Sequence, residues 1–128
     1  MKTVITSENA PKPIGPYSHA NMVPASGNML FVSGQVAKDA KTGELILGDI
    51  KSETKKVMEN VFAILSEAEM DFTHVVKTTI FMKDMNYFGD MNEVYGSFFI
   101  GNFPARETVQ VSRLPLDVNV EISVIAVK

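Results

Sequence analysis

Hydrophobic positions in the middle of the chain recur at the spacing of an α-helix. Between residues 51 and 68 the apolar side chains fall three or four residues apart, with lysine and glutamate between them. Asp49 stands where a helix N-cap residue is expected. The pattern predicts an amphipathic helix over residues 51–68 whose apolar stripe packs in the core. The stripe consists of Val57, Val61, Ile64, Leu65 and Ala68.

A strand pattern and a second helical pattern follow. Residues 73–82 alternate between two faces and are rich in β-branched side chains, which predicts a strand. Residues 86–99 return to helical spacing, although Gly89 and Gly96 lower the helix propensity of this segment. The apolar positions of this predicted second helix are Phe88, Met91, Tyr95, Phe98 and Phe99.

Extended segments dominate the N-terminal third of the chain. Residues 2–5, 18–23 and 29–33 have the composition of strands. The turn-forming residues 26–28 lie between the last two, which predicts that these two strands form a hairpin.

Two further strands are predicted near the C-terminus, over residues 106–112 and 118–127. If these strands paired as a hairpin, Ile125 would lie opposite Arg106. Glu121 would then lie about 13 Å further along its strand, too far for a direct ion pair with Arg106 and far enough to leave room for a ligand or a neighbouring subunit.

The order of elements is strands, helix, strand, helix, strands, without a repeat or a long linker. It predicts one α+β domain over residues 1–128, with both helices on one face of the sheet. Residues 124–127 are apolar in both phases of the last strand, as expected when both faces of a strand are buried. We therefore expect the second face of the sheet to be covered by other copies of the chain.

Composition excludes several classes of function. The chain has no cysteine, so disulfides, thiolate metal sites and thiol nucleophiles are ruled out. A formal net charge of −3 gives no general attraction for nucleic acid, and no apolar run is long enough to cross a membrane. His19 and His74 lie far apart without other ligands at metal-binding spacing, so no metal site is expected. The N-terminal residues lack a signal-peptide pattern, which predicts a cytoplasmic protein.

Arg106 is the first candidate for a functional residue. It follows Phe103-Pro104-Ala105 at the entrance to a predicted strand, where its planar guanidinium could hold a small carboxylate by two parallel hydrogen bonds. Taken alone, an arginine after a turn is more often solvated or part of a weak surface ion pair.

The whole pattern of motifs resembles the Rid family, also called YjgF, and in particular its RidA subgroup of reactive-intermediate deaminases. The resemblance runs from about residue 5 to residue 128 with the motifs in order. They are Ala10-Pro11, Ile14-Gly15-Pro16-Tyr17, Val32-Ser33-Gly34-Gln35, Val76-Lys77-Thr78-Thr79, Phe103-Pro104-Ala105-Arg106, Arg113-Leu114-Pro115 and Val120-Glu121-Ile122.

This resemblance implies a YjgF-like, chorismate-mutase-like fold with a single mixed β-sheet, assembled as a homotrimer with clefts between subunits. It also implies hydrolysis of small 2-imino acids or their enamine tautomers, such as 2-aminoacrylate and 2-aminocrotonate, to 2-keto acids and ammonia. Arg106 would bind the substrate carboxylate and Glu121 would position or activate water. Neither a metal nor an organic cofactor is implied.

The same resemblance assigns further residues to the pocket. Tyr17 would line it, Asn92 would lie near it, and the backbone at Ser33 and Gly34 would offer a carbonyl to the substrate nitrogen. Each has a local alternative, because Tyr17 could anchor a turn, Asn92 could be solvated helix surface and Gly34 could end a strand. Thr108 shares the Arg106 side of its strand in simple alternation and would also line the pocket.

Glu107 departs from the residues expected after the arginine, since RidA members carry a small residue there. A second carboxylate beside Arg106 could divert the arginine's charge or alter a subunit contact. A different class of function also fits the pattern: a homotrimeric binding or protective, chaperone-like protein that holds small keto acids or client proteins without catalysis.

Overall fold

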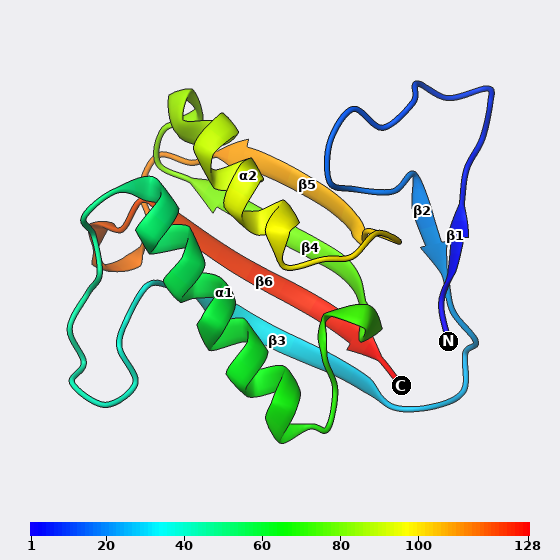
Figure 1. The fold of residues 1–128 in the computed structure, drawn as a ribbon, viewed down its shortest axis with the longest axis horizontal. Helices are drawn as coiled ribbons and strands as arrows, with labels where there is room; N and C mark the ends of the chain where they lie inside the picture. Colours follow the sequence, from blue (N-terminus) through cyan, green and yellow to red (C-terminus); the bar gives the residue numbers. More distant parts are fainter.

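The computed structural model describes residues 1–128 and contains six strands and two α-helices (Figure 1). Short 3₁₀ turns occupy Phe72–His74, Met85–Tyr87 and Pro115–Asp117. The strands are β1 (Thr3–Ile5), β2 (Ala20–Met22), β3 (Met29–Gln35), β4 (Val75–Met82), β5 (Ala105–Gln110) and β6 (Val120–Val127), and the helices are α1 (Ile50–Glu67) and α2 (Phe88–Ser97).

Four strands form a mixed sheet in the order β3-β6-β4-β5. Strand β6 is antiparallel to both of its neighbours, and β4 and β5 run parallel. The prediction of an α+β fold with a mixed sheet is therefore confirmed. The prediction of a single sheet is wrong, because β1 and β2 form a separate two-stranded sheet beside the larger one (Figure 1).

Both predicted hairpins are wrong. Strand β2 pairs with β1, and β3 pairs with the C-terminal strand β6. Strand β4 lies between β5 and β6, so these two strands do not pair with each other. Turn residues indicate where the chain can reverse, but they do not decide which strands pair, because β3 finds its partner β6 at the far end of the chain.

Helix α1 agrees with its prediction to within one residue at each end. The Asp49 carboxylate caps it by accepting hydrogen bonds from the backbone N–H of Ser52 at 2.9 Å and from the Ser52 hydroxyl at 3.0 Å. Helix α2 is shorter than predicted, because a 3₁₀ turn precedes it and the N–H groups of Phe98 and Phe99 bond to carbonyls only three residues back.

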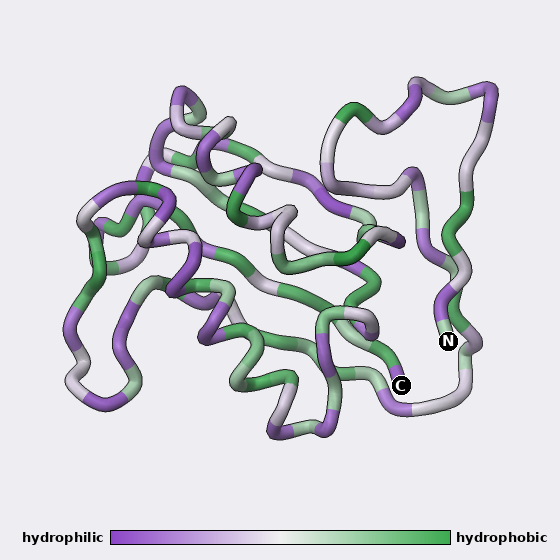
Figure 2. The backbone as a smooth tube through the Cα atoms, viewed as in Figure 1, coloured by the Kyte–Doolittle hydropathy of each residue, from purple (hydrophilic) through white to green (hydrophobic).

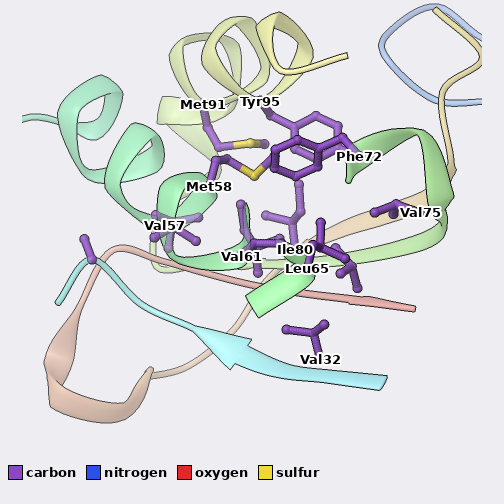
Figure 3. Packing of buried hydrophobic residues seen from close by; sticks show 14 of the residues in the cluster. Val32, Val57, Met58, Val61, Leu65, Phe72, Val75, Ile80, Met91 and Tyr95 are labelled. Carbon is purple, nitrogen blue, oxygen red and sulfur yellow. The ribbon is translucent and has the colours of Figure 1, made fainter. Parts of the chain in front are cut away.

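The two helices cover one face of the four-stranded sheet, as predicted (Figure 1). The core lies between these layers, where Met91 and Tyr95 of α2 meet Met58 of α1 above Ile80 of β4 (Figure 3). One buried polar contact crosses this core, since the Tyr95 hydroxyl donates to the Thr78 hydroxyl over 2.9 Å. Both residues are fully buried. This bond fixes α2 relative to the central strand of the sheet.

The opposite face of the sheet carries no helix, and we call it the open face. Phe31 of β3 and Val109 of β5 lie on it with 68% and 44% of their surfaces exposed. Hydrophobic positions continue along β6 toward the C-terminus (Figure 2). Neither helix combines the length and apolar composition that a membrane-spanning segment requires.

The buried hydroxyl pair gives a direct test of this packing. Tyr95→Phe leaves the Thr78 hydroxyl without its donor, so we expect the free energy of unfolding to fall by about 1–2 kcal/mol in urea denaturation. Tyr87→Phe is the matched control, because Tyr87 is 53% exposed. It should change the unfolding free energy by less than about 0.5 kcal/mol. Equal losses in the two variants would contradict the role of the hydroxyl pair.

Candidate active site

Arg106 is positioned by the parallel pairing of β4 and β5. In this register Arg106 lies beside Thr78, whose side chain points to the helices. Neighbouring residues in register project to the same face of a sheet. Arg106 therefore extends toward α2, over the helix-covered face.

Side chains of α2 surround the Arg106 guanidinium. The Asn92 side-chain oxygen accepts a hydrogen bond from Arg106 Nη1 at 2.6 Å. The rings of Phe88 and Tyr95 have their centroids 5.6 and 5.1 Å from the guanidinium carbon. The guanidinium plane is thereby held by one polar contact and two aromatic rings.

The N-terminal loop supplies another wall. The Tyr17 ring centroid lies 5.6 Å from the guanidinium carbon of Arg106, and the Tyr17 hydroxyl accepts a long hydrogen bond of 3.4 Å from the backbone N–H of Ile14. Gly15 is close enough that an added Cβ would lie 3.6 Å from the Asn92 amide nitrogen and 3.9 Å from Arg106. Tyr17 and Asn92, which the resemblance assigned to the pocket, both lie next to Arg106.

The electrostatics of this cluster favour an anion. Burial lowers the pKa of Arg106 from its usual value, while Tyr95 and Tyr17 act in the opposite direction. An arginine remains protonated even so. Burial raises the pKa of Tyr95 to about 12, so its phenol is neutral at pH 7. No carboxylate lies within 4.0 Å of Arg106. The cluster therefore carries one positive charge without an acidic partner.

Thr108 follows Arg106 on the same face of β5, as predicted. It pairs in register with Ile80, which is fully buried on the helix side. The Thr108 hydroxyl oxygen is buried and has no hydrogen-bond partner within the chain. It is a free polar group beside the arginine.

Glu121 lies in a different environment. Its register partner on β4 is Phe81, and the residues on either side of Glu121, Val120 and Ile122, are fully buried under the helices. Because side chains alternate along a strand, Glu121 projects to the open face.

A β-bulge in β3 lies next to Glu121. The register of β3 against β6 shifts between Val32 and Gln35, so Ser33 and Gly34 form the irregular segment. A Cβ added at Gly34 would lie 2.5 Å from a Glu121 carboxylate oxygen, so a larger residue here would require the Glu121 side chain to move. The Ser33 carbonyl accepts a 3.2 Å hydrogen bond from the Gln35 side chain. Ser33, Gly34 and Glu121 thus form a second cluster.

The sheet separates these two clusters within one chain. Arg106, Asn92 and Tyr17 lie with the helices, whereas Glu121 and Gly34 lie on the open face. The distance predicted between Arg106 and Glu121 assumed that β5 and β6 pair as a hairpin. It does not apply, because β4 lies between these two strands.

Glu107 does not compete for the charge of Arg106. Its carboxylate accepts hydrogen bonds from Lys77 Nζ at 2.8 Å and from the Thr79 hydroxyl at 2.9 Å, both on the open face. The Lys77 hydrogen bond is the largest cause of a lowered pKa at Glu107; burial opposes it, and the weaker hydrogen bond from Thr79 adds to the lowering. Of the two effects considered for Glu107, diversion of the Arg106 charge is therefore wrong, since the two side chains lie on opposite faces as alternation along β5 indicates. An effect of Glu107 on a subunit contact stays a prediction.

Sequence reasoning missed Phe88 and Tyr95 as walls of the Arg106 site. Both were counted only as apolar positions of a core-facing stripe. The available signal was the spacing of Phe88, Asn92 and Tyr95, which places an amide between two aromatic rings on one side of the helix. No group of three or more His, Cys, Asp or Glu residues is placed to hold a metal ion.

Known proteins resemble this chain over its full length. A RutC family protein of Pyrococcus horikoshii is 54% identical over 128 residues, covering 100% of this chain and 99% of the relative. The mouse 2-iminobutanoate/2-iminopropanoate deaminase is 43% identical and covers 100% of this chain and 93% of its own. The crystal structure of E. coli TdcF with bound serine superposes with a TM-score of 0.76 at 39% identity, covering 98% of each chain.

The sequence model of the family described as Endoribonuclease L-PSP matches residues 7–128. This match and the full-length relatives agree with the motifs around Tyr17, Gly34, Arg106 and Glu121. The chain belongs to the YjgF/Rid family.

Proposed function

We propose that the protein hydrolyses small 2-imino acids, or their enamine tautomers, to 2-keto acids and ammonia. The observation that carries this proposal is Arg106: a partly buried guanidinium between aromatic rings, oriented by Asn92 and without an acidic partner. A planar carboxylate matches its hydrogen-bond fork. On the same face of β5, Thr108 has a buried hydroxyl without a hydrogen-bond partner.

The relatives support this substrate class. A deaminase of 2-imino acids is 43% identical to this chain, and the serine bound in E. coli TdcF is a small molecule with an α-carboxylate. The family description also names an endoribonuclease. The net charge of −3 gives no general attraction for RNA, so the observations favour the small acid.

The active site would be completed by two copies of the chain. Arg106 and Glu121 face opposite sides of one sheet, so a single copy cannot present both to one small substrate. The open face, onto which Glu121 projects, also carries exposed Phe31 and Val109, and such apolar surface is typical of subunit contacts. A closed homotrimer, with Arg106 of one copy near Glu121 of the next, satisfies both constraints.

The proposed reaction in such a cleft uses only side chains of the protein, the substrate and water. Glu121 accepts a proton from water while the water oxygen forms a bond to the imine carbon and the C=N electron pair moves to nitrogen; the protonated Glu121 then returns this proton to the nitrogen. The resulting carbinolamine loses ammonia as the C=O bond forms, leaving the 2-keto acid. An enamine must first be protonated at carbon to enter this sequence. Arg106 holds the carboxylate throughout.

The first prediction from this function concerns Arg106, the residue proposed to bind the substrate carboxylate. In Arg106→Ala, we expect keto-acid formation from freshly generated 2-aminoacrylate and 2-aminocrotonate to lose at least about 100-fold in kcat/KM, because the substrate loses a charged two-point contact. Arg106→Lys should fall between this variant and the wild type, since it retains the charge without the fork. The measurement is made against spontaneous hydrolysis in buffer.

Arg113→Ala is the matched control, because Arg113 is exposed and lies outside both clusters. It should stay within about twofold of the wild type. A wild type no faster than buffer would contradict the deaminase proposal and favour a non-catalytic keto-acid-binding protein.

The second prediction separates binding from chemistry. Glu121→Gln should lower kcat by about 100-fold to 10,000-fold, because an amide cannot take a proton from water. The Kd for 2-ketobutyrate, measured by calorimetry, should stay within about threefold, since Arg106 is intact. Glu107→Gln removes a neighbouring carboxylate of the same face and should leave kcat nearly unchanged. Equal losses in both variants would contradict the role assigned to Glu121.

The third prediction tests the shared site. The Arg106→Ala and Glu121→Gln variant proteins are each expected to be inactive alone. They are mixed in equal amounts, unfolded and refolded together. In a cyclic homotrimer, random mixing gives intact Arg106–Glu121 pairs at roughly a quarter of the clefts, so roughly a quarter of the wild-type rate should return. Co-refolding without recovery, in samples whose mixed composition is confirmed by mass spectrometry, would show that each site lies within one chain.

A further inference from the structure

Glu53 is a charged residue in the core of the protein. It lies in the first turn of α1 and is fully buried. Its carboxylate reaches the segment that leads into β6, 66 and 67 residues further along the chain. One oxygen accepts from the Asn119 side chain at 2.8 Å, and the other accepts from the backbone N–H groups of Asn119 at 2.8 Å and Val120 at 3.1 Å.

No basic side chain lies within 4.0 Å of this buried carboxylate. Burying an ionised carboxylate is costly unless hydrogen bonds replace the lost water. Here three N–H donors satisfy both oxygens, and the N-terminal end of α1 adds a favourable dipole. The arrangement gives Glu53 strong contacts to one short segment only.

The segment that Glu53 holds follows an unfavourable turn. Leu116 and Asp117 have φ angles of 61° and 54°, in the left-handed region that residues other than glycine rarely adopt. Such a turn persists only where the surrounding structure supports it. Lys83 donates its backbone N–H to the Asn119 carbonyl at 2.9 Å, and Glu53 holds the N–H side of the same residue.

Glu121 is the next residue after this anchored pair. Its backbone position follows from the Asn119 and Val120 contacts, whereas its side chain abuts Gly34 on the open face. The Glu121 carboxylate lies 2.5 Å from the position that a Cβ at Gly34 would take, so a small displacement of β6 would change the contact between this carboxylate and the bulge.

We propose that Glu53 is a positioning residue for Glu121, which it holds through Asn119 and Val120 without touching the substrate. This inference rests on the proposed function, in which Glu121 acts on water. A buried residue of helix α1 would thus set the position of a carboxylate on the opposite face of the sheet. Misplacement of a reacting group by about 1 Å can cost about 100-fold in rate.

Three substitutions at Glu53 distinguish the effect of its hydrogen bonds on the position of Glu121 from the effect of its charge. Glu53→Ala removes all three acceptor contacts, and Glu53→Asp keeps the charge but is one methylene too short to reach. Both should lower kcat by about 10-fold to 100-fold and leave KM within about twofold, because Arg106 is undisturbed. Glu53→Gln keeps an oxygen for the two backbone N–H groups, and the Asn119 amide can turn its own oxygen to the new NH₂. It should restore kcat to within about threefold of the wild type.

Leu65→Ala is the matched control for lost stability. Leu65 is fully buried in the same helix, about 18 Å from Glu53 at 1.5 Å per residue. Its melting temperature should fall at least as far as that of Glu53→Ala, with kcat unchanged below the transition. If Leu65→Ala loses kcat in the same proportion, or if Glu53→Asp retains the wild-type kcat, the positioning role is overturned.

Amide hydrogen exchange tests, without relying on enzyme activity, whether Glu53 anchors the segment before Glu121. In Glu53→Ala, exchange at Asn119, Val120 and Glu121 should accelerate by at least about tenfold, while the rest of β6 changes little. Unchanged exchange at these residues overturns the inference even if the wild type is an active deaminase. A wild type without turnover, combined with accelerated exchange in Glu53→Ala, overturns the deaminase function and supports the anchoring of this segment.

Discussion

The parallel pairing of β4 with β5 is the constraint from which the arrangement of the site follows. A parallel neighbour must return to the same end of the sheet, so the chain passes through α2 between these strands. The register then sets Arg106 beside Thr78, beneath the helix that the crossover contains. Arg106 meets Asn92 and two aromatic rings for this reason, and the helix that closes the core also forms the walls around the guanidinium.

The same register explains why Glu107 and Arg106 have unrelated surroundings although they are neighbours in the sequence. One lies with the helices and the other with Lys77 on the open face. Glu121 reaches that open face through the antiparallel pairing of β6 with β4. The sheet separates the two polar clusters. Under the proposed function, several chains would have to assemble to bring both clusters to one site.

Local features of this fold could be predicted from the sequence, whereas pairings between distant strands could not. The apolar stripe with Asp49 before it defined α1, and alternation defined β4, because both patterns reflect neighbours a few residues apart. The partner of β3 is the C-terminal strand β6, which its apolar face meets only in three dimensions, so the turn at residues 26–28 predicted the wrong hairpin. Motif resemblance identified Arg106 and Glu121, but alternation alone could not show that a third strand would separate them. Glu53 was indistinguishable from the solvated glutamates of its helix, since its buried partners lie far along the chain.

Tyr95 belongs both to the core and to the wall of the site. Its ring is fully buried, its hydroxyl fixes α2 against β4, and its face lies 5.1 Å from the Arg106 guanidinium. A substitution that changes the size of the Tyr95 side chain would therefore also change the packing of the whole domain. The Gly15–Tyr17 loop borders the same guanidinium from outside the core. A substitution in this loop can therefore alter the surroundings of Arg106 without disturbing the core, whereas a substitution at Tyr95 alters both.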